Sequence, residues 1–251
     1  MPQAYNPIIV ALDVDSAERA IGLADRVSAS VGAVKVGSQL FTAAGPDVVR
    51  RLVERGHRVF LDLKYHDIPN TVAGAVAEAA RLGAWMIDVH AAGGEAMMRT
   101  ARDAAVKAAS VAGRPAPLVI AVTVLTSLDQ AALVSIGVGR PVLHQVEALA
   151  RLARQAGLDG VVASPLEVAR LRRICGPAFT LVTPGIRAES PTEGHRDDQA
   201  RTLSAPATLA AGASYLVVGR PIVAAPDPGA AARAMAASLG IECGAPSGAA
   251  G

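Results

Sequence analysis

The sequence predicts a single (β/α)8 barrel, and two observations carry the prediction. Eight short aliphatic runs alternate with Ala-rich amphipathic segments along all 251 residues, and polar residues follow nearly every aliphatic run. Eight such units fit the count and the size of this barrel, which typically has about 250 residues. The strands are expected at Ile8–Leu12, Ala33–Gly37, Arg58–Leu63, Met86–Val89, Leu118–Val122, Gly160–Ala163, Phe179–Val182 and Tyr215–Val218.

The segments between the strands carry helix signals. A stripe of apolar residues at helical spacing follows Thr71. Capping boxes are expected where Asp15 precedes Glu18 and where Ser164 precedes Glu167, with Pro165 as the first helical residue. Glycines mark the expected helix ends, where a left-handed residue is favoured; they are Gly56, Gly83, Gly157 and Gly212.

The alternative to a barrel is a doubly wound open sheet. An open sheet would gather polar strand-end residues at one switch point, whereas a barrel brings all strand ends to one mouth. Here they are distributed over nearly all the strands, which favours the barrel. They are Asp13, Lys35, Asp62, Lys64, Asp88, His90, Thr123, Thr126, Ser164, Thr183 and Arg220.

Composition excludes several classes of protein. The net charge is only +2 and aromatic residues make up 3%, which gives no case for nucleic acid or membrane binding. Neither a membrane span nor a signal peptide is recognisable. Two cysteines provide no disulfide framework, so a reduced cytoplasmic setting is expected. We expect one barrel domain over residues 1–240 and a disordered tail over residues 241–251, which are rich in small residues.

The most informative stretch runs from Val59 to Thr71. Val59, Leu61 and Leu63 would form one apolar strand face, and Phe60, Asp62 and Lys64 the other. Charges on a buried strand face are costly unless they are paired or used. A purely structural interpretation is an ion pair that fixes the loop. This interpretation is disfavoured because charged residues also end other strands, which gives one set of alternating charge: Asp13, Lys35, Asp62, Lys64 and Asp67.

This charge set suggests proton transfer. Carboxylates keep neighbouring lysines charged, and a fixed ammonium can protonate an atom that gains negative charge. A Schiff base on Lys64 is an alternative, although acidic neighbours would raise the proton affinity of the amine. In the turn after the last strand, Gly219 and Arg220 suggest a phosphate site.

Other polar groups are less specific. A long polar segment after Arg187 suggests a lid, or else a solvated loop. Ser127 could form a hydrogen bond with an amide edge of a substrate, or it could cap a helix together with Gln130. No histidine spacing suits zinc, and Trp85 is expected in the core.

Six motifs in this order resemble the orotidine 5'-phosphate decarboxylase family, in its shorter bacterial form, over residues 7–239. The Asp-x-Lys-x-x-Asp pattern alone is shared with sugar-phosphate relatives, whereas the longer string that begins at Asp62 is more specific. The motifs are Ile9-Val-Ala-Leu-Asp13, Val34-Lys-Val-Gly37, Asp62-Leu-Lys-Tyr-His-Asp-Ile-Pro-Asn-Thr71, Asp88-Val-His-Ala-Ala-Gly-Gly94, Thr183-Pro-Gly-Ile-Arg187 and Val217-Val-Gly-Arg220.

The resemblance implies cofactor-free, metal-free decarboxylation of orotidine 5'-monophosphate to uridine 5'-monophosphate in pyrimidine biosynthesis. Lys64 would protonate carbon 6 of the pyrimidine, and Asp62 would face the leaving carboxylate. Asp13 and Lys35 would hold the ribose and the charge network. The resemblance also implies a homodimer with shared sites, in which Asp67 and Thr71 enter the partner's site.

The resemblance further implies which residues contact the pyrimidine and the phosphate. Thr126 and Ser127 match the segment that contacts the pyrimidine. The phosphate and lid contacts match Arg187, Gln199, Gly219 and Arg220, where the match of Gln199 rests on the neighbouring Asp198 and Arg201.

Three other functions stay open at this point. One is a magnesium-dependent sugar-phosphate decarboxylase or synthase of the same superfamily, acting on keto-sugar phosphates. Another is a Schiff-base aldolase built on Lys64, which borohydride would trap. The third is a nucleotide-binding barrel without catalysis, which would bind uridine 5'-monophosphate and leave orotidine 5'-monophosphate unchanged.

Overall fold

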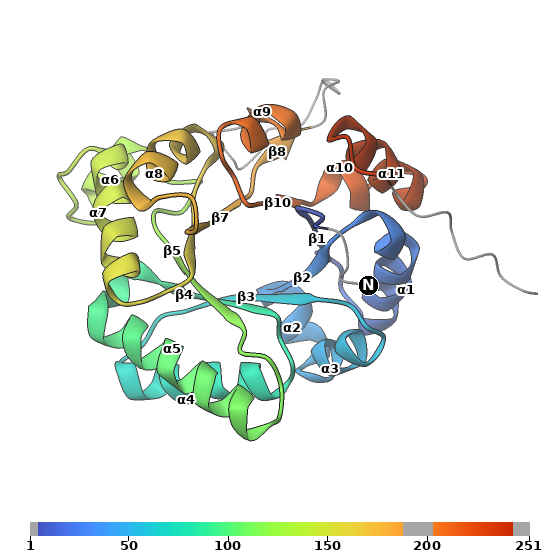
Figure 1. The fold of residues 1–251 in the computed structure, drawn as a ribbon, viewed down its shortest axis with the longest axis horizontal. Helices are drawn as coiled ribbons and strands as arrows, with labels where there is room; N and C mark the ends of the chain where they lie inside the picture. Colours follow the sequence, from blue (N-terminus) through green and yellow to red (C-terminus); the bar gives the residue numbers. More distant parts are fainter. Residues whose placement is uncertain (1–4, 188–202, 243–251) are drawn as a thin grey trace, which may run out of the picture.

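Eight parallel strands close into a barrel surrounded by helices (Figure 1). The computed structural model describes residues 5–187 and 203–242. The strand order is β1-β10-β7-β6-β5-β4-β3-β2, so that the first strand pairs with the last and the sheet has no free edge. The predicted (β/α)8 barrel is therefore confirmed.

All eight predicted strands are present, with ends that differ from the prediction by at most two residues. The barrel strands are β1 (Ile8–Ala11), β2 (Ala33–Gly37), β3 (Val59–Tyr65), β4 (Met86–His90), β5 (Leu118–Val122), β6 (Gly160–Val162), β7 (Thr180–Thr183) and β10 (Tyr215–Val218). A separate two-stranded sheet, β8 (Ile186–Arg187) with β9 (Leu203–Ser204), was not predicted, because two-residue strands have no periodicity to detect.

The helices lie outside the barrel. They are α1 (Ala17–Val27), α2 (Ser38–Ala44), α3 (Asp47–Glu54), α4 (Pro69–Arg81), α5 (Gly94–Val111), α6 (Gln130–Ser135), α7 (Val142–Gln155), α8 (Val168–Cys175), α9 (Ala205–Ala210), α10 (Arg220–Val223) and α11 (Pro228–Ser238). Beyond α11, Ile241 still packs against the core, and residues 243–251 of the expected tail lie outside the described residues.

Strand alternation divides the apolar side chains into two layers. One layer lies between the strands and the helices, and β3 contributes Val59, Leu61 and Leu63 to it, as predicted. The other fills the barrel interior, where Phe60 of β3 packs with seven further buried residues. They are Ile9, Ala11, Ala33, Met86, Ile120, Val182 and Val217. Half-buried Trp85 packs at the edge of this interior layer.

The predicted helix ends are partly correct. The capping box at Ser164 is present, and the Ser164 N–H donates to the Glu167 carboxylate at 2.8 Å. The four predicted stop glycines all have positive φ. The box at Asp15 is wrong, because Ser16 caps α1 by accepting from the Arg19 N–H, and Asp15 instead pairs with the Arg19 guanidinium.

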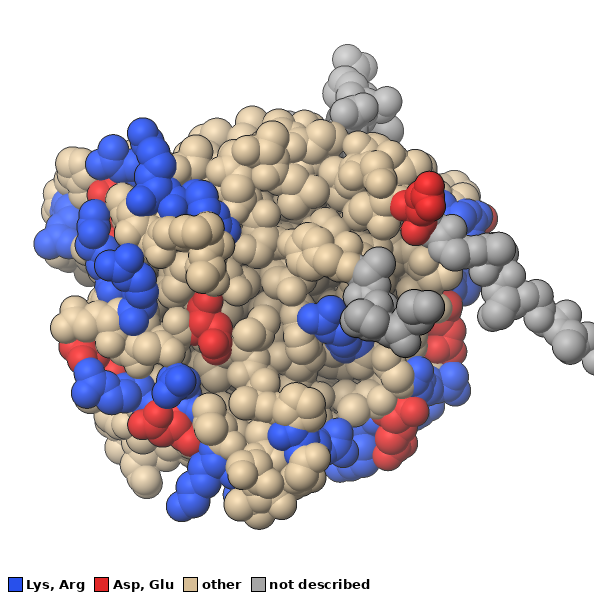
Figure 2. Space-filling view, viewed as in Figure 1, with Lys and Arg blue, Asp and Glu red and all other residues tan. Residues whose placement is uncertain are grey.

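Charged side chains of both signs lie along the left, lower and right parts of the face shown in Figure 2. Basic side chains gather on that face over α7 and α8, whose arginines are Arg151, Arg154, Arg170, Arg172 and Arg173. Within the described residues, every helix is too short or too polar to cross a bilayer.

The packing between α3 and the barrel gives a test of the fold. Leu52 of α3 is completely buried, so Leu52→Ala should lower the free energy of unfolding by about 2–5 kcal/mol. Val134→Ala is the matched control, because Val134 is 53% exposed and its truncation should cost less than about 0.5 kcal/mol. Denaturant unfolding of both variants measures this difference, and equal losses would contradict the packing described here.

Candidate active site

Four of the predicted charged residues form one cluster at the carboxyl ends of the first three strands. The Asp62 carboxylate lies between two ammonium groups: Lys35 Nζ is 3.1 Å from Asp62 Oδ2, and Lys64 Nζ donates to Asp62 Oδ1. Lys35 Nζ also lies 3.3 Å from Asp13 Oδ1. Asp13, Lys35, Asp62 and Lys64 thus form a continuous chain of alternating charge.

Strand register brings these residues together. Lys35 shares the inward face of β2 with Ala33, and Asp62 shares the inward face of β3 with Phe60. In the β2–β3 pairing, Gly37 lies opposite Asp62, two residues beyond Lys35. The Lys35 and Asp62 side chains therefore meet above the apolar layer of the barrel interior. They lie at the carboxyl ends of the strands, where proteins of this fold carry their active sites.

The two central groups are both charged although both are buried. Burial alone would raise the pKa of Asp62, but Lys35, the neighbouring Asp88 side chain and Lys64 hold that pKa well below its usual range. Burial alone would lower the pKa of Lys35, but Asp62 and Asp13 raise it above the ordinary value for lysine. The exposed fraction is 9% for each residue, so the cluster is a fixed pattern of charge with little screening by water.

The Lys64 backbone is unusual. Lys64 has φ of 51°, the only positive φ at a non-glycine residue in the described part of the chain. The β3–β4 register also shifts there, because Leu61 pairs with Ile87 but Tyr65 pairs with Val89. The Lys64 N–H then donates to Asp88 Oδ1 at 2.8 Å. A β-bulge thus redirects the Lys64 side chain.

Asp88 is buried completely beside this bulge. Burial raises the pKa of Asp88 well above its ordinary value, and the nearby Asp62 carboxylate adds to the effect. Its neighbour His90 stacks on His66, with ring centroids 5.2 Å apart. Burial, His66 and Lys64 lower the pKa of His90, which favours the neutral imidazole.

Two glycines make room for the cluster. A Cβ atom on Gly37 would lie 2.9 Å from Lys35 Nζ, so any side chain there would displace the ammonium group. A Cβ atom on Gly219 would lie 3.9 Å from Asp13 Oδ2, which places the turn after β10 beside the cluster. Sequence reasoning missed the role of Gly37, because only the strand register reveals its neighbour.

Two predicted site residues lie apart from the cluster within one chain. Asp67 is exposed, and its carboxylate accepts the Ile68 N–H at 2.6 Å. Thr71 is exposed in the first turn of α4. Ile68 lies between them and is 67% exposed, a high fraction for a large apolar side chain.

The predicted pyrimidine-contacting residues follow β5. Thr126 is half-buried and Ser127 is exposed in the turn that follows β5. The expected cap of Ser127 with Gln130 is wrong, because Asp129 caps α6 by accepting the Ala132 N–H at 2.8 Å.

The structure describes only some of the residues predicted to bind phosphate. Arg220 begins α10 directly after Gly219. The backbone of Arg187 pairs with Ser204 between β8 and β9. Gln199 and the predicted lid over residues 188–198 lie outside the described residues.

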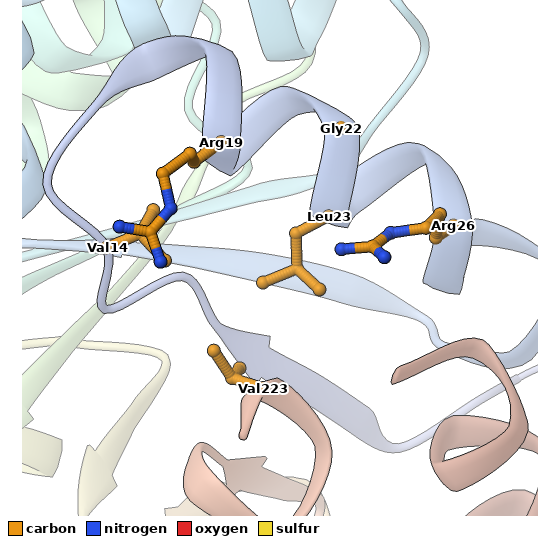
Figure 3. Close-up of a pocket in the computed structure, with 6 residues that line it drawn as sticks. All are labelled: Val14, Arg19, Gly22, Leu23, Arg26 and Val223. Atoms are coloured by element: carbon orange, nitrogen blue, oxygen red, sulfur yellow. The ribbon is translucent and has the colours of Figure 1, made fainter. Parts of the chain in front are cut away.

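A cavity of about 390 Å³ lies elsewhere, between α1 and α10 (Figure 3). It is lined by Val14, Arg19, Gly22, Leu23, Arg26 and Val223, none of which is a predicted site residue. In the described part of the chain, no group of three or more His, Cys, Asp and Glu side chains is arranged to hold a metal ion.

Comparison with known protein sequences relates this chain to one enzyme family. The sequence profile of the family described as "Orotidine 5'-phosphate decarboxylase / HUMPS family" matches residues 6–235. The chain is 56% identical over 237 residues to the orotidine 5'-phosphate decarboxylase of Moorella thermoacetica, covering 94% of this chain and 93% of that protein. It is 50% identical to the protein of the same name from Sodalis glossinidius, covering 94% and 91%.

Solved structures agree in fold. The crystal structure of orotidine 5'-phosphate decarboxylase from Lactobacillus acidophilus superposes with a TM-score of 0.80 at 38% identity, covering 93% of this chain and 99% of that one. The enzyme of that name from Pyrococcus horikoshii OT3 gives 0.73 at 26% identity, covering 92% and 98%. With the sequence matches, these likenesses show that this chain belongs to the orotidine 5'-phosphate decarboxylase / HUMPS family.

Proposed function

We propose that this protein decarboxylates orotidine 5'-monophosphate to uridine 5'-monophosphate in pyrimidine biosynthesis, without metal or cofactor. Family membership supports the reaction. The observation that carries the mechanism is the Asp62 carboxylate held between the ammonium groups of Lys35 and Lys64. We also propose a cytoplasmic location, which the free thiol of Cys175 supports.

Lys64 is the proton donor in this mechanism. When the bond between carbon 6 and the carboxylate breaks, its electron pair stays on carbon 6 and carbon dioxide leaves. The Lys64 ammonium stabilises this developing charge and then transfers one N–H proton to carbon 6. Lys64 is left neutral and regains a proton from solvent. Because Lys64 is 36% exposed at its side chain, it can reach both the substrate and water.

Asp62 and Lys35 prepare the site for this step. The Asp62 carboxylate faces the leaving carboxylate and fixes the Lys64 ammonium, while Lys35 keeps Asp62 ionised. Stabilising the transition state by charges already in place requires little rearrangement during the reaction. Asp13 and Lys35 hold the ribose.

The remaining contacts bind the two ends of the nucleotide. Thr126 and Ser127 contact the pyrimidine. Gly219 and Arg220 hold the phosphate with Arg187 and Gln199, and the start of α10 beside Asp13 supports this placement.

A homodimer completes the site in this proposal. Asp67 and Thr71 lie at the exposed start of α4, outside the charge cluster of their own chain. The exposed Ile68 between them gives this segment an apolar group to bury against a second copy. Asp67 and Thr71 would then contribute to the site of the partner.

Lys64→Ala should abolish turnover and leave uridine 5'-monophosphate binding measurable, because the proton donor is lost while the phosphate contacts stay. We expect kcat to fall by at least about 100-fold. The loss of the orotate absorbance band measures turnover, and calorimetry measures product binding. Lys107→Ala, on the exposed face of α5, is the matched control and should keep full activity. Near-normal activity of Lys64→Ala would refute the role of Lys64.

Removal of metal distinguishes this function from its magnesium-dependent relatives. Enzyme treated with EDTA and exchanged into metal-free buffer should turn over orotidine 5'-monophosphate at the untreated rate, because the ammonium groups alone stabilise the carbanion. If the treated enzyme were inert and magnesium restored it, a keto-sugar phosphate would be the better substrate.

A mixing experiment tests the shared site. Lys64→Ala and Asp67→Ala should each be inactive, but a refolded equal mixture should regain activity. Random pairing makes half of the dimers mixed, and one of the two sites in each mixed dimer has both residues intact, so about a quarter of the sites should work. A mixture no more active than its parents would mean that Asp67 does not serve the partner's site.

A further inference from the structure

Asp88 occupies the place where the β3–β4 ladder is interrupted. Four residue steps on β3, from Leu61 to Tyr65, lie opposite two steps on β4, from Ile87 to Val89. Asp88 is the β4 residue within this gap, on the inward face. Its Oδ1 accepts the Lys64 N–H at 2.8 Å, so a side chain replaces the strand carbonyl that a regular ladder would supply.

The charges around Asp88 are already balanced. Lys35 pairs with Asp13 and Asp62, and Lys64 pairs with Asp62, which gives two cations and two anions. Asp88 is 0% exposed, and within the described residues its Oδ2 atom has no hydrogen-bond partner. An ionised Asp88 would therefore be a third, unpaired and buried anion, which is a costly arrangement.

We propose that Asp88 is a positioning residue that works as an uncharged carboxylic acid: its Oδ1 holds the Lys64 backbone in the left-handed conformation that directs the ammonium group at Asp62. A left-handed backbone is unfavourable for lysine, so it persists only where its surroundings enforce it. This inference rests on the proposed role of Lys64 as proton donor.

The electrostatics agree with this assignment. Burial and Asp62 raise the pKa of Asp88, and Lys64 only partly opposes them. Asp62, Lys64 and Tyr65 on β3 are the titratable groups that act on Asp88, and His90 lies two residues further on β4. Burial and Asp88 raise the pKa of Tyr65 to about 12, so the phenol stays neutral.

Two substitutions separate positioning from charge. Asp88→Asn keeps the oxygen that accepts the Lys64 N–H and replaces the O–H by an N–H, so it should keep kcat within about tenfold of the wild type. Asp88→Leu keeps the number and branching of the side-chain heavy atoms but has no acceptor, and it should lose about 100-fold in kcat with KM changed less than about threefold, since misplacement by about 1 Å has effects of that size. An Asp88→Asn variant as inactive as Asp88→Leu, or a fully active Asp88→Leu, would overturn the proposal.

The protonation state has a test that needs no activity. In the unfolded chain the pKa of the Asp88 carboxyl is about 3.9, and below this pH both the native and the unfolded state carry its proton. Above this pH the unfolded chain releases the proton, whereas the native state keeps it. Wild type therefore loses stability as the pH rises toward the native pKa, and Asp88→Asn does not. The Tm of Asp88→Asn minus that of wild type should increase from about pH 4.5 to about pH 7. A constant difference would show that Asp88 is ionised.

One control variant and one comparison complete the design. Asp159→Asn removes another carboxylate that accepts a strand N–H, that of Val119 at 2.7 Å, at the opposite end of the barrel, and it should leave kcat unchanged. If wild type itself fails to consume orotidine 5'-monophosphate, the proposed function is wrong, whereas an active wild type with a constant Tm difference refutes only the inference about Asp88.

Discussion

The candidate site depends on one carboxylate held between two ammonium groups inside the barrel mouth. Burial alone would raise the pKa of Asp62 and lower the pKa of Lys35, so each charge would be disfavoured without the other. Together they remain ionised, and each is fixed by the other. The closed barrel sustains this arrangement, because Phe60 and its interior neighbours support the charges from below and neighbouring strands fix their spacing.

Much of this was predictable from the sequence because the signals are local. Aliphatic runs gave the strands, and alternation along β3 separated Val59, Leu61 and Leu63 from Phe60 and Asp62. The gathering of Asp13, Lys35, Asp62 and Lys64 also followed, since all barrel strands end at one mouth. Asp67 had been expected in the same set, but it lies in the exposed segment before α4.

What escaped prediction depends on neighbours that are distant in the sequence. A regular strand was expected through Leu63, and only the pairing of β3 with β4 reveals the bulge that turns Lys64 to φ of 51°. Asp88 was recognised as a polar strand end, but its bond to the Lys64 N–H requires that register. The wrong caps at Asp15 and Ser127 have a simpler cause, because Ser16 and Asp129 are nearby residues that cap equally well.

The pairing of β1 with β10 has a consequence for the order in which the site is built. Asp13 follows the first strand, and the turn at Gly219 beside it follows the last. Lys35 and Lys64 can pair with Asp62 once the first three strands have assembled. The turn at Gly219 comes to lie beside Asp13 only after the last strand pairs with the first and closes the barrel. A nascent chain on the ribosome therefore carries the charged groups long before the barrel around them is closed.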